Sequence, residues 1–191
     1  MPVLATRRLE ISALPAAHLR LSLSDPEQLA AALNCTLAEG CFSDASRRAI
    51  YVKLEKMELA GETLHPWYTY WLIVLRDEKV ALGLVGFKGF PDDQGEVEIG
   101  YGISPLYQGR GYMTEAVQRL VAWAFLQPGC GSVCAETLRT NLASHRVLQK
   151  SGFQVFRETQ QEIYWRIRRG AVDQKPAGGS QPKAERRGGD R

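Results

Sequence analysis

The amino-acid sequence predicts a single α/β (α+β) domain in which a mostly antiparallel, twisted sheet of about seven strands is flanked by about four helices. The length of 191 residues is close to that of one typical domain. Several short runs are apolar and β-branched or alternate apolar with polar residues, and three such runs follow one another across residues 68–103. Residues 113–125 instead keep an i, i+3, i+4, i+7 apolar pattern, which indicates an amphipathic helix.

The first part of the chain predicts one strand and two helices. Residues 8–14 alternate apolar with polar residues up to a proline, where a half-buried strand would stop. Ser24-Asp-Pro-Glu27 combines a capping serine, a first-turn proline and a glutamate three residues after the cap, so a helix is expected from there to residue 33. Ser43 and Asp44 offer a second cap, which opens a helix that Gly61 is expected to end in the left-handed conformation.

The middle of the chain predicts an antiparallel meander. Residues 68–76 and 80–88 are rich in aromatic, β-branched and other apolar residues and are separated by a polar turn, which is typical of a hairpin. A turn rich in proline, aspartate and glycine precedes a third strand at residues 96–103. The aromatic residues of the first strand are expected to pack in the core rather than to line a groove; they are Trp67, Tyr68, Tyr70 and Trp71.

The last part predicts a strand, helix, strand crossover followed by a hairpin. The amphipathic helix near Met113 leads to a strand at residues 133–138. Asn141 can cap a further helix, which is expected to close at Gly152. The hairpin would join residues 153–156 to residues 163–167.

The charge distribution separates a body from a tail. We expect the domain to occupy residues 1–169 and a flexible tail to occupy residues 170–191, because the tail has almost nothing apolar to bury. The tail holds five basic and three acidic residues, so its net charge of +2 is most of the +3 of the whole chain. The nearly neutral body is a poor match to the basic face of a nucleic-acid-binding protein.

Membrane and metal partners are also not expected. No apolar run approaches the roughly 20 residues of a membrane span, and the start of the chain lacks a signal pattern, so a cytoplasmic protein is expected. The four cysteines have spacings of six and four and no nearby histidine, which favours reduced thiols over a zinc site or a redox pair. A monomer and a homodimer are equally compatible with the sequence.

The most informative feature is the loop before the amphipathic helix. Gly109 and Gly111 would let the backbone curl so that several N–H groups point into one concavity, and the helix start adds unpaired donors. Such a loop suits a phosphate or pyrophosphate, although a tight turn that needs glycine only for its own geometry would explain it as well. It lacks the Lys-Ser/Thr pair of a Walker loop, and Thr114 stands where a dinucleotide fingerprint needs its third glycine.

The loop sequence Gln108-Gly-Arg-Gly-Tyr-Met113 resembles the acetyl-CoA signature Gln/Arg-x-x-Gly-x-Gly/Ala of the GNAT N-acetyltransferases, with a methionine in place of the last small residue. The motifs around it are similar in order to those of the RimJ/RimL branch; they are Thr6-Arg-Arg-Leu9, Glu98-Ile-Gly-Tyr101, Gly111-Tyr-Met-Thr-Glu115-Ala and Asn141-Leu-Ala-Ser144 before Gly152-Phe153. The resemblance is specific over residues 71–153, looser over residues 6–70 and absent from the tail. It implies the acyl-CoA N-acyltransferase fold, with a sheet that splays after the strand preceding the glycine loop.

The resemblance also implies acetyl-CoA as the cofactor and assigns residues to it. The backbone of Tyr101, Gly102 and Ile103 would pair with the pantetheine arm, and Asn141 would contact the cofactor near its reactive end. The loop and the first helical turn would bind the pyrophosphate through their N–H groups; the residues concerned are Gln108, Gly109, Arg110, Gly111, Tyr112, Met113 and Thr114. The Arg110 side chain could reach a phosphate or stay solvated.

The same resemblance implies that an acceptor amine attacks the thioester directly, in a ternary complex that needs a proton acceptor and a proton donor. Glu98, on the strand leading to the acetyl position, is the first candidate for the base, and Glu136 is the second. Glu98 could instead pair with a basic neighbour, and Glu136 could simply face solvent.

Ser144 matches the serine thought to assist the departing thiolate in RimL-like members, although a first-turn serine can also bond back to its helix cap. Many members have a tyrosine four residues later, where this chain has Leu148.

The leading functional hypothesis is an acetyl-CoA-dependent N-acetyltransferase that acts on a primary amine, either a protein N-terminus or a small molecule. A non-catalytic acyl-CoA-binding or regulatory module is the alternative. A third reading treats the glycine loop as structural and the protein as an α/β interaction domain.

Overall fold

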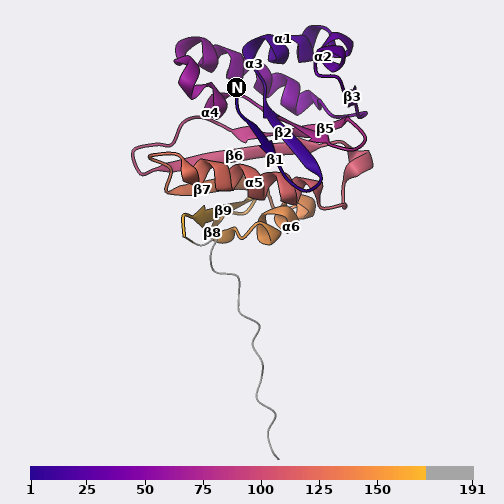
Figure 1. Ribbon diagram of the computed structural model, residues 1–191. Coiled ribbons are helices and arrows are strands. Elements are labelled where there is room, and N and C mark those ends of the chain that lie inside the picture. Colours follow the sequence, from indigo (N-terminus) through magenta and orange to yellow (C-terminus); the bar gives the residue numbers. More distant parts are fainter. Residues whose placement is uncertain (171–191) are drawn as a thin grey trace, which may run out of the picture.

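The computed structural model describes residues 1–170, and within them nine strands form one sheet in the order β1-β2-β4-β5-β6-β7-β9-β8, with β3 paired to β5 (Figure 1). The strands are β1 (Val3–Ala5), β2 (Leu9–Ala13), β3 (Thr36–Leu37), β4 (Trp71–Leu75), β5 (Val80–Phe87), β6 (Glu96–Ile103), β7 (Ser132–Leu138), β8 (Gln154–Glu158) and β9 (Glu162–Arg168). The helices are α1 (Ala16–Ser24), α2 (Pro26–Ala32), α3 (Asp44–Leu59), α4 (His65–Tyr68), α5 (Tyr112–Leu126) and α6 (Leu142–Lys150), with 3-10 turns η1 (Glu62–Leu64) and η2 (Pro105–Tyr107). The tail predicted at residues 170–191 lies, apart from Gly170, outside the described residues.

The predicted fold class is confirmed. Most neighbouring strands are antiparallel, and β6–β7 and β3–β5 are the parallel pairs among the described strands. The parallel β6–β7 pair with α5 between its strands is the predicted crossover. The expected meander is present as β4, β5 and β6, and the expected hairpin is present as β8 and β9.

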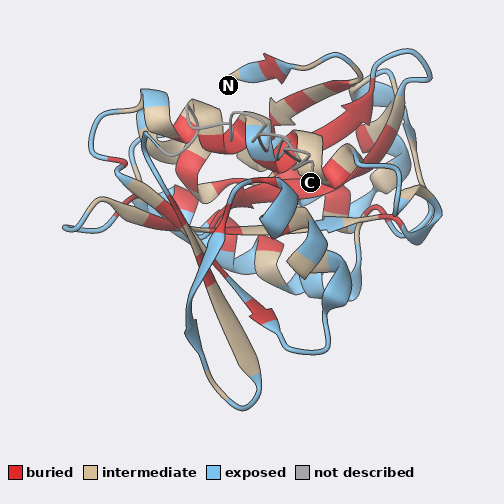
Figure 2. Cartoon of the chain, turned by 90° about the horizontal axis from the view of Figure 1, so that it is seen from below, coloured by how far each residue is buried: buried red, intermediate tan, exposed pale blue. Residues whose placement is uncertain are grey.

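Two apolar clusters cover the two faces of the central strands. In β4, Trp71 and Ile73 face the cluster that contains the buried side of α5, whereas Leu72 and Val74 face the cluster that contains α1 and α3. A strand covered on both faces reads as a continuous apolar run, which explains why this segment does not alternate. Figure 2 shows the buried residues along the central strands.

Three local predictions in the first part of the chain were wrong in detail. The chain contains an additional helix, α1, that ends at Ser24, so the cap of α2 is Asp25, whose carboxylate accepts a hydrogen bond from the Gln28 N–H at 2.9 Å. Gly61 does not end α3 in the left-handed region, because its φ is −62°. By contrast, Ser43 caps α3 as predicted, accepting from the Ser46 N–H at 3.2 Å.

The aromatic run begins as a helical turn rather than as a strand. Residues 65–68 form α4, with a proline in its first turn, and β4 starts only at Trp71. Trp67 and Trp71 are buried, as expected, and both rings lie about 5 Å from that of Trp123 on α5. Tyr70 is only half-buried and contributes to a pocket described below.

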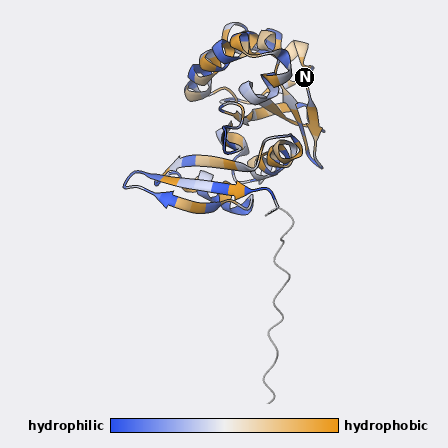
Figure 3. Ribbon diagram, turned by 90° about the vertical axis from the view of Figure 1, so that its left-hand side faces the viewer, coloured by the Kyte–Doolittle hydropathy of each residue, from blue (hydrophilic) through white to orange (hydrophobic). Residues whose placement is uncertain are grey.

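The sheet splays at β6, as the resemblance implied. β6 pairs with β7 over three positions only, ending at Glu98 opposite Cys134, whereas residues 99–103 pair with β5 alone. The side view in Figure 3 shows the two halves of the molecule diverging. The β6 edge that faces β7 therefore offers backbone donors and acceptors with no strand partner among the described residues.

The four cysteines are free, and Cys41 and Cys130 are buried. Within residues 1–170, no group of three or more potential metal-ligating side chains comes together. None of the helices in this range is long and apolar enough to cross a membrane.

Candidate functional site

The glycine loop has the backbone geometry that its sequence predicts. Gly109 and Gly111 have φ values of 75° and 80°, a region that side chains other than glycine rarely adopt. Gly111 is also the N-cap of α5 and provides no side chain to cap it. The first-turn N–H groups of this 15-residue helix are therefore free of a side-chain cap and add the positive end of its dipole.

A contact from the beginning of the chain braces this loop. The Glu115 carboxylate, in the first turn of α5, accepts hydrogen bonds from the Thr6 hydroxyl at 2.5 Å and the Arg8 Nε at 2.7 Å. The Arg8 guanidinium also donates to the Arg110 carbonyl at 3.1 Å and lies 4.5 Å from the centre of the Tyr112 ring. Partial burial raises the pKa of Glu115, but the bonds from Thr6 and Arg8 outweigh it, so the net pKa lies below its ordinary value.

A cleft of about 740 Å³ joins the glycine loop, the end of β6 and one side of α6. Eleven of the predicted site residues line it: Tyr101, Gly102, Ile103, Gln108, Gly109, Gly111, Tyr112, Met113, Thr114, Asn141 and Ser144. Residues 101–114 and helix α6 supply this lining, and the space between them lies where β6 and β7 diverge.

Three predicted residues are not part of this lining. The Arg110 side chain is exposed, with its guanidinium 5.3 Å from the centre of the Tyr107 ring. Glu98 and Glu136 lie on the strands beside the splay. Sequence reasoning missed Tyr107 and two cationic residues of α6, Arg146 and Lys150, which do line the cleft.

The signal for the two cations was their spacing. Arg146 and Lys150 lie four positions apart in the sequence, which places them on the same side of a helix. The apolar Ala143 and Val147 line the cleft from the same helix. Together these residues give one wall of the cleft a positive charge beside an apolar strip.

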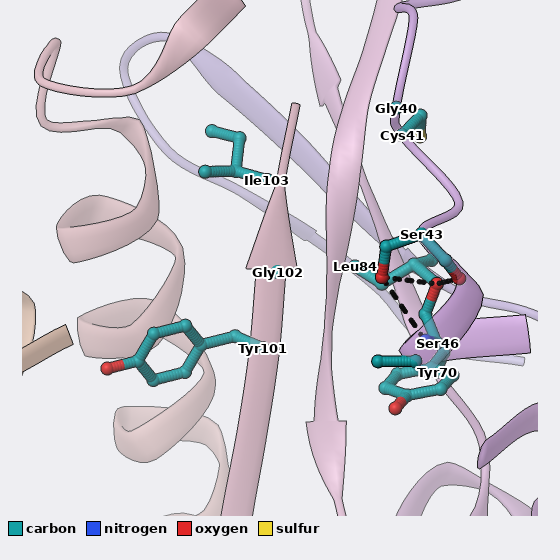
Figure 4. A pocket seen from close by; sticks show the side chains of 10 residues that line it. Gly40, Cys41, Ser43, Ser46, Tyr70, Leu84, Tyr101, Gly102 and Ile103 are labelled. Atoms are coloured by element: carbon teal, nitrogen blue, oxygen red, sulfur yellow. Dashed lines mark hydrogen bonds between the residues drawn. The ribbon is translucent and has the colours of Figure 1, made fainter. Parts of the chain in front are cut away.

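Tyr101 connects the two elements that the splay separates. Its hydroxyl donates to the Ser144 carbonyl at 3.3 Å, so the ring spans from β6 to α6, and burial raises the pKa of this hydroxyl to about 12. Figure 4 shows its side chain on the opposite side of β6 from Ser43 and Ser46. The phenol therefore stays neutral and holds the base of the cleft together.

Asn141 and Ser144 form the predicted helix cap. The Asn141 Oδ1 accepts from the Ser144 N–H at 3.1 Å, which satisfies one of the orphan donors at the start of α6. Both residues face the cleft. Leu148 is fully buried in the core, so this position of α6 contributes no polar group to the cleft.

Glu98 lies at the point where the sheet divides. It occupies the last β6 position paired with β7, and it faces away from the core that buries Val97 and Ile99. Its Oε1 is 2.5 Å from the Lys88 Nζ, so the expected alternative of a basic partner is present. The Glu98 side chain remains 29% exposed.

Glu136 lies on the same side of the sheet as Glu98. Desolvation raises its pKa, and Glu162 and the charge of Glu98 raise it further, whereas Lys88 lowers it. Glu136 is more exposed than Glu98 and lies two residues past the last β6–β7 pair. The two carboxylates thus share one surface, with Glu98 nearer to the branch point.

The chain matches a known protein family over most of its length. The family model described as "Acetyltransferase (GNAT) domain" matches residues 4–154. The uncharacterized N-acetyltransferase YjdG of Bacillus subtilis (strain 168) is 33% identical over 95 residues, which are 50% of this chain and 56% of that protein. YoaA of the same organism, also an uncharacterized N-acetyltransferase, is 30% identical over 125 residues, 60% of this chain and 70% of its own. The chain thus spans little more than half the length of the first relative.

Solved structures share the fold at low sequence identity. RimL, the ribosomal L7/L12 alpha-N-protein acetyltransferase in complex with coenzyme A, has a TM-score of 0.63 and 14% identity, covering 89% of this chain and 99% of that one. The ribosomal-protein-S5-alanine acetyltransferase from Vibrio fischeri has a TM-score of 0.60 and 18% identity, covering 92% and 100%.

Proposed function

The chain belongs to the family of acetyltransferase (GNAT) domains, and on that premise we propose that it transfers an acetyl group from acetyl-CoA to a primary amine. The acceptor is either a small-molecule amine or a protein N-terminus, and the solved relatives whose names specify N-terminal or ribosomal-protein substrates favour the latter. The observation that carries the proposal is the cleft, because one cavity combines the uncapped start of α5 with the unpaired edge of β6.

The residues of the cleft fit the chemical parts of coenzyme A. The N–H groups of residues 108–114 suit a pyrophosphate, and Arg146 and Lys150 add positive charge. The unpaired β6 edge at residues 101–103 suits the amide groups of a pantetheine arm, which would bind as an additional strand. Acetyl-CoA supplies the acetyl group as a thioester, the bond that the acceptor must break.

The transfer requires one bond to form and one to break. The amine nitrogen bonds to the acetyl carbon as the carbon–sulfur bond breaks, the nitrogen loses a proton, and the sulfur leaves as a thiolate that takes up a proton. We assign proton removal to Glu98, because its carboxylate lies at the branch point and is open to the acceptor side. Lys88 acts as its positioning partner, and Ser144, at the start of α6, assists the sulfur.

Free-thiol release from acetyl-CoA tests this function against a panel of small amines and N-terminal peptides. Saturable, amine-dependent release is the expected result. Coenzyme A binding without release would favour the non-catalytic module, and no heat of binding in calorimetry would leave the glycine loop with a structural role only.

A further inference from the structure

A second pocket lies on the other side of β6 from the cofactor cleft. It encloses about 190 Å³ between the β6 residues 101–103, the segment before α3 and the start of α3 itself (Figure 4). The two cavities share Tyr101, Gly102 and Ile103. The end of one strand is therefore the wall between the cofactor cleft and this pocket.

A side chain at position 102 would point into the pocket. Gly102 pairs with Leu84 across the antiparallel β5–β6 ladder, and directly opposite residues point to the same face of a sheet. Leu84 packs in the cluster of α1 and α3, on the face opposite to Tyr101. Leu84, Gly102 and the ring of Tyr70 therefore border one space on the α3 side.

Neither packing nor backbone strain requires glycine at position 102. A Cβ at Gly83 would collide with the Gly102 carbonyl, and one at Gly86 would lie 2.7 Å from the Thr69 carbonyl, so those two glycines permit close backbone approach. A Cβ at Gly102 would meet no such neighbour within 4 Å, and its φ is not in the left-handed region. Glycine in a strand interior makes the strand less stable than alanine would, because it loses more conformational freedom on folding. What Gly102 provides is the open space itself.

The lining of the pocket is uncharged. Its side chains are hydroxyl, thiol, aromatic and aliphatic groups, from Ser43, Ser46, Cys41, Tyr70 and Leu84 among others. Outside the lining, the Lys53 Nζ lies 4.4 Å from the centre of the Tyr70 ring and donates to the carbonyls of Tyr68, Thr69 and Phe87. A charged group buried here would gain no ion pair, which disfavours it strongly. A volume of about 190 Å³ is small beside the roughly 300–1,000 Å³ of a drug-sized ligand pocket, so only a compact group would fit.

A bare stretch of strand links this pocket to the candidate base. Glu98, Gly100 and Gly102 occupy alternate positions and share the face directed at α3. A Cβ at Gly100 would also meet nothing within 4 Å. Over four residues a strand extends about 13 Å. An amine above Gly100, halfway along this floor and reached by the Glu98 carboxylate directly or through one water, could thus place a compact substituent against Gly102.

We propose that this pocket receives the substituent next to the acceptor amine, that it selects a compact uncharged group, and that Gly102 is the residue that sets the size limit. The inference rests on the proposed function, whose acceptor class it narrows. Enlarging residue 102 shortens the pocket from its floor, whereas the neighbouring Tyr101 and Ile103 keep their side chains on the other face of the strand.

The test uses tripeptide amides that differ only in their first residue, with glycine, alanine, valine, leucine, phenylalanine, lysine or glutamate, together with alkylamines of matching size. Thiol release at saturating acetyl-CoA gives kcat/KM for each acceptor, and the chain is compared with its Gly102→Ala and Gly102→Val variants. The chain itself should prefer valine and leucine over lysine and glutamate by at least tenfold. Gly102→Val should lower the leucine-to-glycine ratio of kcat/KM at least tenfold, with a smaller drop for Gly102→Ala. Whether peptides or alkylamines react better identifies the source of the amine.

Gly61→Val is the matched control, because Gly61 has an ordinary φ and open space around it and lies at the far end of α3. It should leave all ratios unchanged. An unaltered leucine-to-glycine ratio in Gly102→Val, or equal reactivity of charged and neutral peptides, would overturn the inference.

Acceptor binding is also followed by amide chemical shifts in the presence of coenzyme A, where no transfer can occur. Shifts at Ser46 and Gly102 that Gly102→Val reduces would support the pocket even if thiol release fails, and the failure would then belong to the proposed function alone. Shifts confined to other parts of the chain, or none with any acceptor, would refute the pocket.

Discussion

The two sides of β6 differ in how their residues are distributed along the chain. The cofactor cleft is made mostly of one stretch, residues 101–114, with one side of α6 added. The pocket on the other side combines the end of β6 with short pieces of the segment before α3 and of α3, one residue that precedes β4 and one residue of β5. A site that is local in sequence has a readable motif, whereas a site assembled by the fold has none.

The largest effect should come from the branch point between these two sides. We expect Glu98→Gln to lower kcat by about 100-fold or more, because general bases typically contribute factors of that size. The rate of thiol release at saturating substrate concentrations measures kcat. Calorimetry should find the coenzyme A affinity unaltered, since Glu98 does not line the cleft. Glu136→Gln is the matched control on the next strand, and a larger loss there would reverse the assignment of the base.

A change in the glycine loop should affect the cofactor side alone. Gly111→Val places a β-branched residue at a φ of 80°, and left-handed backbone costs other residues about 1–2 kcal/mol. Coenzyme A affinity should therefore fall by about 5- to 30-fold in calorimetry. Gly61→Val controls for the substitution itself, and full affinity in Gly111→Val would mean that the loop does not hold the cofactor.

The brace between Thr6, Arg8 and Glu115 should stabilise the cofactor side in a pH-dependent manner. We expect Glu115→Gln to lower the unfolding free energy at pH 7 by about 1 kcal/mol, because bonds to a charged group are strong but this one is partly exposed. The pKa of Glu115 is lower in the folded protein than in the unfolded chain, where it is about 4.3. The ionised carboxylate therefore stabilises the fold at pH values above about 4.3, and this stabilisation is lost as the pH falls through the folded pKa. Denaturant unfolding between pH 7 and pH 3 should show the difference between the two proteins shrinking toward acid. A difference that grows toward acid would contradict the lowered pKa.

The smallest effect should come from the cations of α6. Lys150→Ala or Arg146→Ala should weaken coenzyme A binding by a few-fold, because both side chains line the cleft at its open face. The loss should be larger at low salt than at high salt, since screening already weakens such contacts. A loss independent of salt would indicate a packing role instead.

The same contrast explains how much was predictable. Gly109, Gly111 and Asn141 have local backbone roles, two in the left-handed region and one as a helix cap, so residue type and local position were enough to predict those roles. The contact of Thr6 and Arg8 with Glu115 joins residues more than 100 positions apart, and no local pattern encodes that meeting. Tyr70 was expected in the core with its aromatic neighbours, yet it is half-buried beside the pocket, because the start of α3 leaves space over it. Helix α1 escaped prediction because the sequence signals at Ser24 and Asp25 suit either the end of one helix or the start of the next.

The most direct test of the account is amine-dependent thiol release from acetyl-CoA, measured side by side in the parent chain, Glu98→Gln and Gly111→Val. The account predicts saturable release in the parent, a loss of kcat in Glu98→Gln, and a raised KM for acetyl-CoA in Gly111→Val. Release that is absent with every amine while coenzyme A still binds would contradict it, as would release that both substitutions leave unchanged.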